Sequence, residues 1–108
     1  MAQRSISLHA RLKWPDVKDD YDIWHEEMPI GRVRLAGDRA NEAAAWEWSI
    51  VVPMAMPDWA RGVGTTRDDC MKDFSAAWGR LLNETPPERL GRALDLMRAW
   101  LKPKMAAG

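Results

Sequence analysis

The spacing of hydrophobic residues changes near the middle of this chain, and that change restricts its possible folds more than any other feature. Over residues 5–14, apolar and polar side chains alternate, which is typical of a strand with one buried face. Beyond Thr66, apolar residues recur every three or four positions, as in helices that bury one side. Strands followed by helices predict an α+β domain.

Four segments are predicted to be strands: 5–14, 21–25, 30–35 and 46–52. The inner face of the first carries Ile6, Leu8, Ala10, Leu12 and Trp14, and Pro15-Asp16 ends it. The connection at 26–29 is short enough for a hairpin, after which Val33 and Leu35 point inward. Residues 37–41 and the longer stretch 54–65 show no period, so we expect loops there, the second one irregular.

Two helices should follow the strands. Thr66 with Asp69 is typical of a capping box, and Thr85 with Pro86-Pro87 and Glu88 marks a second start. The first apolar arc holds Cys70, Met71, Phe74, Ala77, Trp78, Leu81 and Leu82; the second holds Leu90, Ala93, Leu94, Met97, Trp100 and Leu101. Pro103 should end the second helix. The prediction is one domain, 1–108, with an ordered core at 5–102: an antiparallel sheet of three to four strands, then two helices packed on one face (β-β-β-β-α-α).

Composition narrows the functional classes. The chain has 108 residues, with 16 basic and 16 acidic side chains that cancel, so it lacks the basic surplus typical of nucleic-acid-binding proteins. A single cysteine, no secretory leader and no long apolar run favour a cytoplasmic protein without a membrane span. Seven tryptophans make the chain tryptophan-rich, and Trp14, Trp46, Trp48 and Trp78 lie on predicted core faces.

Short motifs follow one another between residues 20 and 80. They are Asp20-Tyr21-Asp22-Ile23, Ile30-Gly31-Arg32-Val33, Trp46-Glu47-Trp48-Ser49, and Gly64-Thr65-Thr66-Arg67 with Met71, Phe74 and Trp78 behind. In this order the chain resembles a group of short uncharacterised bacterial proteins with the pattern DYDV, VGRI, WxW[ST] and GxxxTRxxxM. That group has no assigned activity, so the resemblance implies no catalytic residue. It suggests that Gly31 marks a place where a neighbouring side chain, such as a tryptophan, approaches the backbone closely.

No arrangement of residues indicates catalysis, a cofactor or a metal. His25-Glu26-Glu27 lacks an established ligand spacing, and a hairpin-end histidine beside two solvated acids explains it better. Cys70 lies in a first helical turn, but the neighbouring acids and its place in the apolar arc favour a buried structural thiol. The glycines at 62 and 64 before Thr66 lack the lysine of a phosphate-binding loop, so helix capping is preferred.

Two surfaces remain as candidates for binding. On the outer face of the sheet, Trp24, Arg32 and Arg34 could clamp a nucleic acid or a peptide, unless Asp22 and Glu47 pair with the arginines across the strands.

On the second helix, Trp100 and Leu96 lie about 80° and 120° from Leu90, so Leu96 and one face of Trp100 should be near solvent beside Arg89 and Arg92. The alternative is that the loop at 54–65, with Met56 and Trp59, covers them. The favoured function is a non-catalytic protein-interaction or regulatory module that binds a protein partner or itself. A nucleic-acid-binding module is the alternative, and a small-molecule-binding protein or enzyme comes third.

Overall fold

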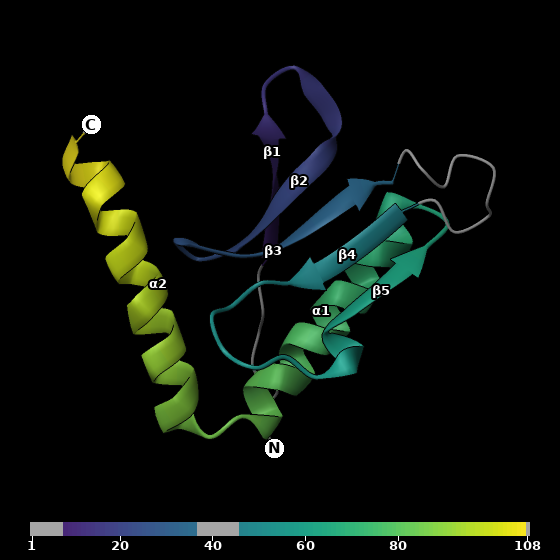
Figure 1. Ribbon diagram of the computed structural model, residues 1–108. Helices are drawn as coiled ribbons and strands as arrows, with labels where there is room; N and C mark the ends of the chain where they lie inside the picture. Colours follow the sequence, from purple (N-terminus) through teal and green to yellow (C-terminus); the bar gives the residue numbers. More distant parts are fainter. Residues whose placement is uncertain (1–7, 37–45, 108) are drawn as a thin grey trace.

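The computed structural model describes residues 8–36 and 46–107, and it shows an antiparallel five-stranded sheet followed by two helices packed against it (Figure 1). The strands are β1 (Leu8–Trp14), β2 (Val17–His25), β3 (Met28–Leu35), β4 (Trp46–Ile50) and β5 (Arg61–Gly64). A short 3₁₀ helix, η2 (Asp58–Ala60), precedes β5, and the helices are α1 (Arg67–Glu84) and α2 (Pro87–Ala107). The strands lie in the sheet in chain order. The expected α+β class is therefore confirmed, with one strand more than predicted.

The additional strand is β5, which corrects the prediction of an irregular loop over 54–65. Trp46 pairs with Gly64 and Trp48 pairs with Gly62, so β5 extends the sheet beyond β4. The strand has only four residues and its glycines interrupt any alternating pattern. Gly62 has no room for a side chain, because an added Cβ would lie 2.9 Å from Nε1 of Trp48. The contact with Trp48 requires glycine at position 62, and this glycine removes the alternating pattern by which a strand is recognised in a sequence.

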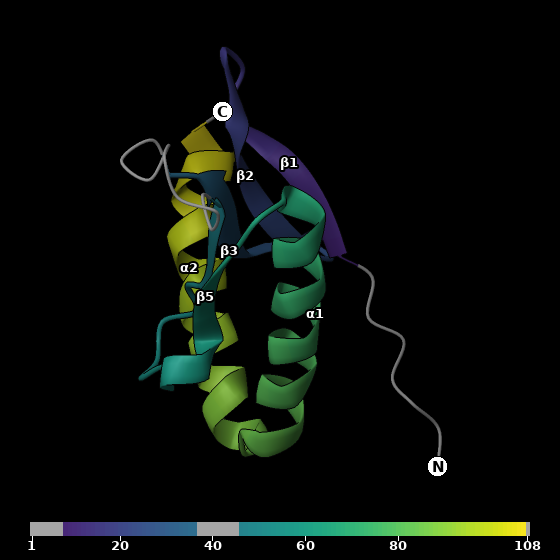
Figure 2. The ribbon, with the colours of Figure 1, turned by 90° about the vertical axis from the view of Figure 1, so that its right-hand side faces the viewer.

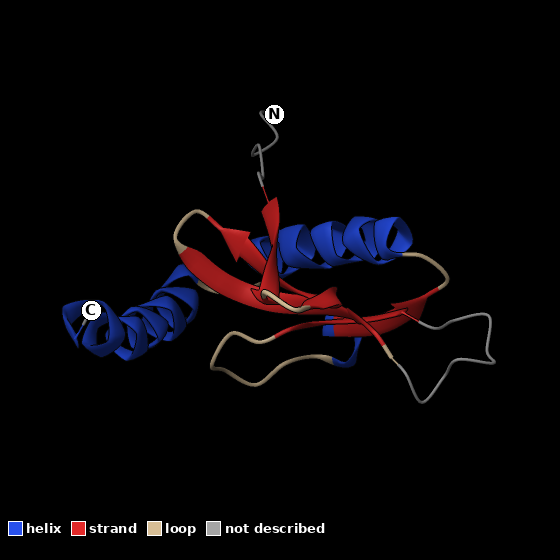
Figure 3. Ribbon diagram, turned by 90° about the horizontal axis from the view of Figure 1, so that it is seen from above, coloured by secondary structure: helices blue, strands red, loops and turns tan. Residues whose placement is uncertain are grey.

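Helix α1 lies across one face of the sheet (Figures 2 and 3). Its predicted cap is present, since Thr66 Oγ1 accepts a hydrogen bond from the Asp69 amide at 3.1 Å. The buried side chains of α1 belong to the predicted arc: Cys70, Phe74, Ala77, Trp78 and Leu81. They pack with the strand residues that face them, among them Ile23, Val33, Trp48 and Ile50. Large apolar side chains from both layers therefore form a single core.

Gly31 allows the two layers to approach. A Cβ atom at this position would lie 2.1 Å from Cε2 of Phe74 and 2.6 Å from the carbonyl oxygen of Ser49. The expected close approach at Gly31 is present, but the side chain that makes it is Phe74 rather than a tryptophan. Phe74 also contacts Trp48 edge to face, with 5.9 Å between the ring centroids.

The first hairpin differs from its prediction. β2 begins at Val17, four residues earlier than expected, and its first residues pair only with β1. The hairpin tip therefore projects beyond β3 (Figure 1). Leu12 and Trp14 are 47% and 52% exposed, so the prediction that Trp14 belongs to the core is wrong. The alternating pattern identified the strand correctly, but a pattern cannot show whether a helix covers the apolar face.

Leu35, predicted to point inward, is 40% exposed at the end of β3. Residues 5–7 of the first predicted strand and the predicted loop at 37–41 lie outside the described residues. The predicted hairpin at 26–29 is confirmed in a tighter form, with His25 paired to Met28 across Glu26-Glu27. Glu26 takes the turn with a φ of 57°, a left-handed conformation that non-glycine residues seldom adopt.

Helix α2 starts at Pro87, as its proline-rich cap predicted, but it continues past Pro103 to Ala107. Pro103 has no N–H to donate to the carbonyl of Ala99, four residues earlier, but Ala99 is exposed, so water can bond to that carbonyl and the helix continues. Ala93 and Met97 join the core from this helix, and Leu90, Leu94 and Leu101 are half-buried. In Figure 3, α2 lies beside one end of the sheet, whereas α1 crosses the sheet.

Candidate functional site

The arginines of the predicted sheet-face site are bound to acidic neighbours. Arg32 donates two hydrogen bonds to Asp20, from Nε at 2.7 Å and from an η nitrogen at 2.5 Å. Asp20 is only 7% exposed, and this hydrogen-bonded pair lowers the pKa of its carboxyl group. The backbone places Asp22 opposite Arg32, so the Arg32 side chain reaches diagonally to Asp20. The predicted partner, Asp22, pairs with Lys13 instead, at 3.4 Å.

The other half of this surface is also paired internally. Nε of Arg34 lies 2.5 Å from Glu47, as expected from their opposed positions on β3 and β4. Trp24 is half-buried, and the guanidinium carbon of Arg11 lies 4.6 Å from its ring centroid. The structure thus places Trp24, Arg32 and Arg34 on one sheet, but each already has a partner within the chain. These contacts satisfy the charges, as in a solvated sheet face.

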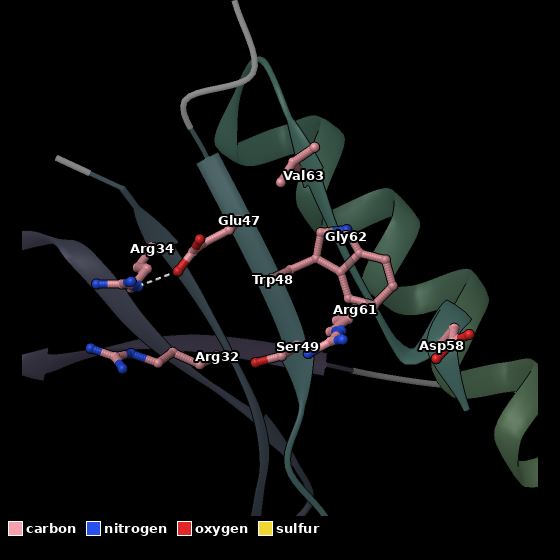
Figure 4. Close-up of a pocket in the computed structure, with 9 residues that line it drawn as sticks. All are labelled: Arg32, Arg34, Glu47, Trp48, Ser49, Asp58, Arg61, Gly62 and Val63. Atoms are coloured by element: carbon pink, nitrogen blue, oxygen red, sulfur yellow. Dashed lines mark hydrogen bonds and ion pairs between the residues drawn. The ribbon is translucent and has the colours of Figure 1, made fainter. Parts of the chain in front are cut away.

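A shallow cavity of about 690 Å³ opens beside these pairs (Figure 4). Arg32, Arg34 and Glu47 line one part of it, while Asp58 and Arg61 line another. Unlike Arg32 and Arg34, Arg61 forms no ion pair with another described residue. No sequence pattern singled out Arg61, because it lies in the stretch predicted to be an irregular loop.

Trp48 also borders this cavity, with its indole beside Gly62 (Figure 4). Its Nε1 is buried and has no hydrogen-bond partner among the described residues. By contrast, the indole N–H of Trp78 donates to Nδ1 of His25 at 3.1 Å. His25 therefore has a structural contact with α1, which neither the metal hypothesis nor the hairpin-end interpretation anticipated. The contact joins residues 53 positions apart, so no local pattern could indicate it.

The predicted α2 surface is open to solvent. Leu96 is 46% exposed and Trp100 is 57% exposed, one turn apart on the same side of the helix. Arg89 is also exposed on this helix. The alternative, in which Met56 and Trp59 cover these residues, does not occur: Trp59 lies beneath Arg80, whose guanidinium carbon is 4.1 Å from the ring centroid. Leu96 and Trp100 thus form an apolar strip that the rest of the described chain leaves exposed.

A second apolar surface was not anticipated. It consists of Leu12, Trp14 and Val17 on the projecting β1–β2 hairpin, and all three side chains are exposed. Arg11 and Lys13 alternate with the apolar residues along β1.

The thiol of Cys70 lies in the core, as its place in the apolar arc predicted. Cys70 is fully buried, and burial together with Asp73, Asp69 and Glu47 raises its pKa to about 11. A buried thiol with a raised pKa is a poor nucleophile at neutral pH. Across the two described stretches, no three His, Cys, Asp or Glu side chains gather as metal ligands would. Neither helix, as far as it is described, has the length and apolar character needed to cross a bilayer.

Comparison with known proteins identifies no relative: no family model matches the chain, and no significant match was found among curated proteins or solved structures. The function is therefore inferred from the geometry of this chain alone.

Proposed function

We propose that this domain is a non-catalytic protein-interaction module that binds its partner through the exposed side of α2. The observation that carries the proposal is the exposure of Leu96 and Trp100 one turn apart. Full burial of a large apolar side chain that starts in water stabilises by about 1.5–3 kcal/mol, and about half of each of these two side chains is still available for a partner to bury. Tryptophan and arginine are also the residue types that most often dominate binding energy at interfaces.

The position of these residues supports the same proposal. α2 is anchored by Ala93 and Met97, which are buried along the neighbouring stripe of the same helix, so the strip is held at the edge of a packed, rigid element. A preformed helix face loses little conformational entropy when it binds. Arg89 extends the apolar strip with a basic group, which favours a partner surface with an apolar centre and an acidic edge.

The test compares three variants. Leu96→Glu and Trp100→Glu place a charge in the strip, whereas Val63→Glu makes the same change at an exposed apolar residue of β5. Sedimentation velocity measures self-association, and capture from native lysate, with and without nuclease, measures binding to other proteins. We expect both α2 variants to remain folded by circular dichroism and to lose the complex, while Val63→Glu retains it.

Two results would contradict the proposal. If Val63→Glu weakens the complex as much as Leu96→Glu does, general surface hydrophobicity is responsible and α2 is not the interface. If nuclease abolishes capture, the nucleic-acid alternative is favoured, and Arg61 is the first residue to test.

A further inference from the structure

The outer edge of β1 is a surface separate from the exposed side of α2. β1 is the first strand of the sheet, so only its inner edge is hydrogen bonded, to β2. None of the described residues pairs with its outer edge. A free edge presents unpaired backbone N–H and C=O groups to which another strand can bond. The opposite edge, β5, has only four residues, whereas β1 has seven.

The two faces of β1 differ in chemistry. His9, Arg11 and Lys13 alternate with Ala10 and Leu12, and all five residues are exposed. A strand that pairs with this edge would therefore meet basic side chains on one face of the sheet and apolar side chains on the other.

The inner edge of β1 shows which sequence suits that pattern. Arg11 is opposite Asp22, while Ala10 and Leu12 are opposite Ile23 and Tyr21. Lys13 also forms an ion pair with Asp22. Over Asp20-Tyr21-Asp22-Ile23, the strand that β1 already binds thus alternates acidic and apolar residues, which match the basic and apolar faces of β1 around Arg11, whereas His9 lies opposite Trp24.

We propose that the outer edge of β1 binds an extended segment of a partner protein in which acidic residues alternate with apolar ones. Main-chain hydrogen bonds add that segment to the sheet as a further strand, and the alternating side chains determine its register. The segment would also cover part of the hairpin tip, where Leu12, Trp14 and Val17 are exposed.

Charge argues against a second copy of this chain as the occupant. In an antiparallel β1–β1 pair that keeps the apolar residues on one face, His9, Arg11 and Lys13 of each copy oppose the same three residues of the other. Like charges directly opposite one another are destabilising. A nucleic acid would satisfy the basic face but would leave the backbone edge and the apolar face unpaired.

The test uses a fluorescein-labelled peptide of alternating Asp and Val or Ile residues, titrated with the full chain and followed by anisotropy. The matched probes are the same peptide with Lys in place of Asp, and a single-stranded oligonucleotide of equal charge. Each Asp of the acidic peptide would face a basic residue of β1, whereas each Lys of the basic peptide would face a like charge. We therefore expect the acidic peptide to bind more than about tenfold tighter than the basic one. Hydrogen exchange should slow at the amides of β1.

Two variants locate the site. Arg11→Gln should weaken binding of the acidic peptide by up to about fivefold, the effect of one cross-strand pair, while Arg89→Gln, the same change on α2, leaves it unaltered. Leu96→Glu should bind the peptide as the wild type does, so failure of the α2 proposal is separate from failure of this one. Three outcomes would each overturn the inference. The first is equal weakening of peptide binding by Arg11→Gln and Arg89→Gln. The others are tighter binding of the oligonucleotide than of the acidic peptide, and slower hydrogen exchange at amides outside β1 instead of within it.

Discussion

Gly31 is the residue at which the fold accepts the least additional volume. The ring of Phe74 occupies the space that a side chain at position 31 would need, because a Cβ atom there would lie 2.1 Å from Cε2 of Phe74. We expect Gly31→Ala to lower the free energy of unfolding by about 1–3 kcal/mol, because the ring and the carbonyl of Ser49 would both have to move. Urea unfolding followed by tryptophan fluorescence measures this change.

The matched control is Gly91→Ala on α2, where nothing lies within 4 Å of the added atom. Alanine favours a helix over glycine, so we expect this variant to be more stable by about 0.5–1 kcal/mol. Opposite signs at the two glycines would confirm that contact, and not glycine content, decides the effect. A Gly31→Ala variant as stable as wild type would refute the described packing.

Asp20 makes stability depend on pH. Its pKa is lowered in the folded protein by the hydrogen bonds from Arg32, so the pair stabilises the fold above the ordinary pKa near 3.8. That contribution is lost as the pH falls through the lower folded pKa. The reason is that the carboxyl group of Asp20 takes up its proton at a higher pH in the unfolded state than in the folded state. We expect Asp20→Asn to cost about 1–3 kcal/mol at pH 7, because it leaves the buried pair unmatched.

The difference between wild type and Asp20→Asn should shrink below pH 4, as measured by urea titrations at several pH values. Asp95→Asn serves as the control, because Asp95 pairs with Arg98 on an exposed helix surface. An exposed pair contributes little. If the two variants respond alike to pH, the Asp20–Arg32 pair has no special role.

At the scale of elements, α1 holds the sheet through Trp78. This side chain is fully buried, and its indole N–H donates to His25 on β2. We expect Trp78→Ala to cost about 3–5 kcal/mol, through the cavity left behind and the lost hydrogen bond. Trp100→Ala removes the same side chain from an exposed position on α2 and should cost less than about 0.5 kcal/mol. Thermal melts compare the two; equal losses would mean that α2 needs Trp100 for docking and would contradict its proposed role.

The elements themselves were predicted unequally. The start of α1 was found because Thr66 caps it through a local hydrogen bond. The start of α2 was found because prolines suit a first helical turn. Thr85, the predicted cap of α2, is the C-cap of α1 instead, and its backbone N–H donates to the carbonyl of Leu81. β5 was missed, because a strand of four residues with two glycines carries no period. The candidate residues on α2 lie where the helical spacing placed them, whereas the β1 edge became a candidate only when the sheet order was known.

At the scale of the whole molecule, the rate at which the Cys70 thiol reacts measures how often the whole domain unfolds. Cys70 lies in the first turn of α1 and is fully buried against β5, with Sγ 3.0 Å from where a Cβ on Gly64 would lie. Because the thiol is buried and its pKa is raised to about 11, we expect slow reaction with a thiol reagent at neutral pH and fast reaction in denaturant. The native rate should increase in Trp78→Ala, in proportion to the fraction of unfolded protein. Fast labelling of the native wild type would contradict the described core.

The sequence by itself determined four of the five strands, both helix starts, the Thr66 cap and the buried arc of α1, because these depend on periodicity and on contacts a few residues apart. Only the tertiary structure decided which apolar faces are covered. Trp14 and Trp48 both lie in alternating strands, yet Trp14 is 52% exposed and Trp48 is 7% exposed. The difference arises because α1 packs over β4 and not over the projecting hairpin, and long-range packing of this kind leaves no trace in local spacing.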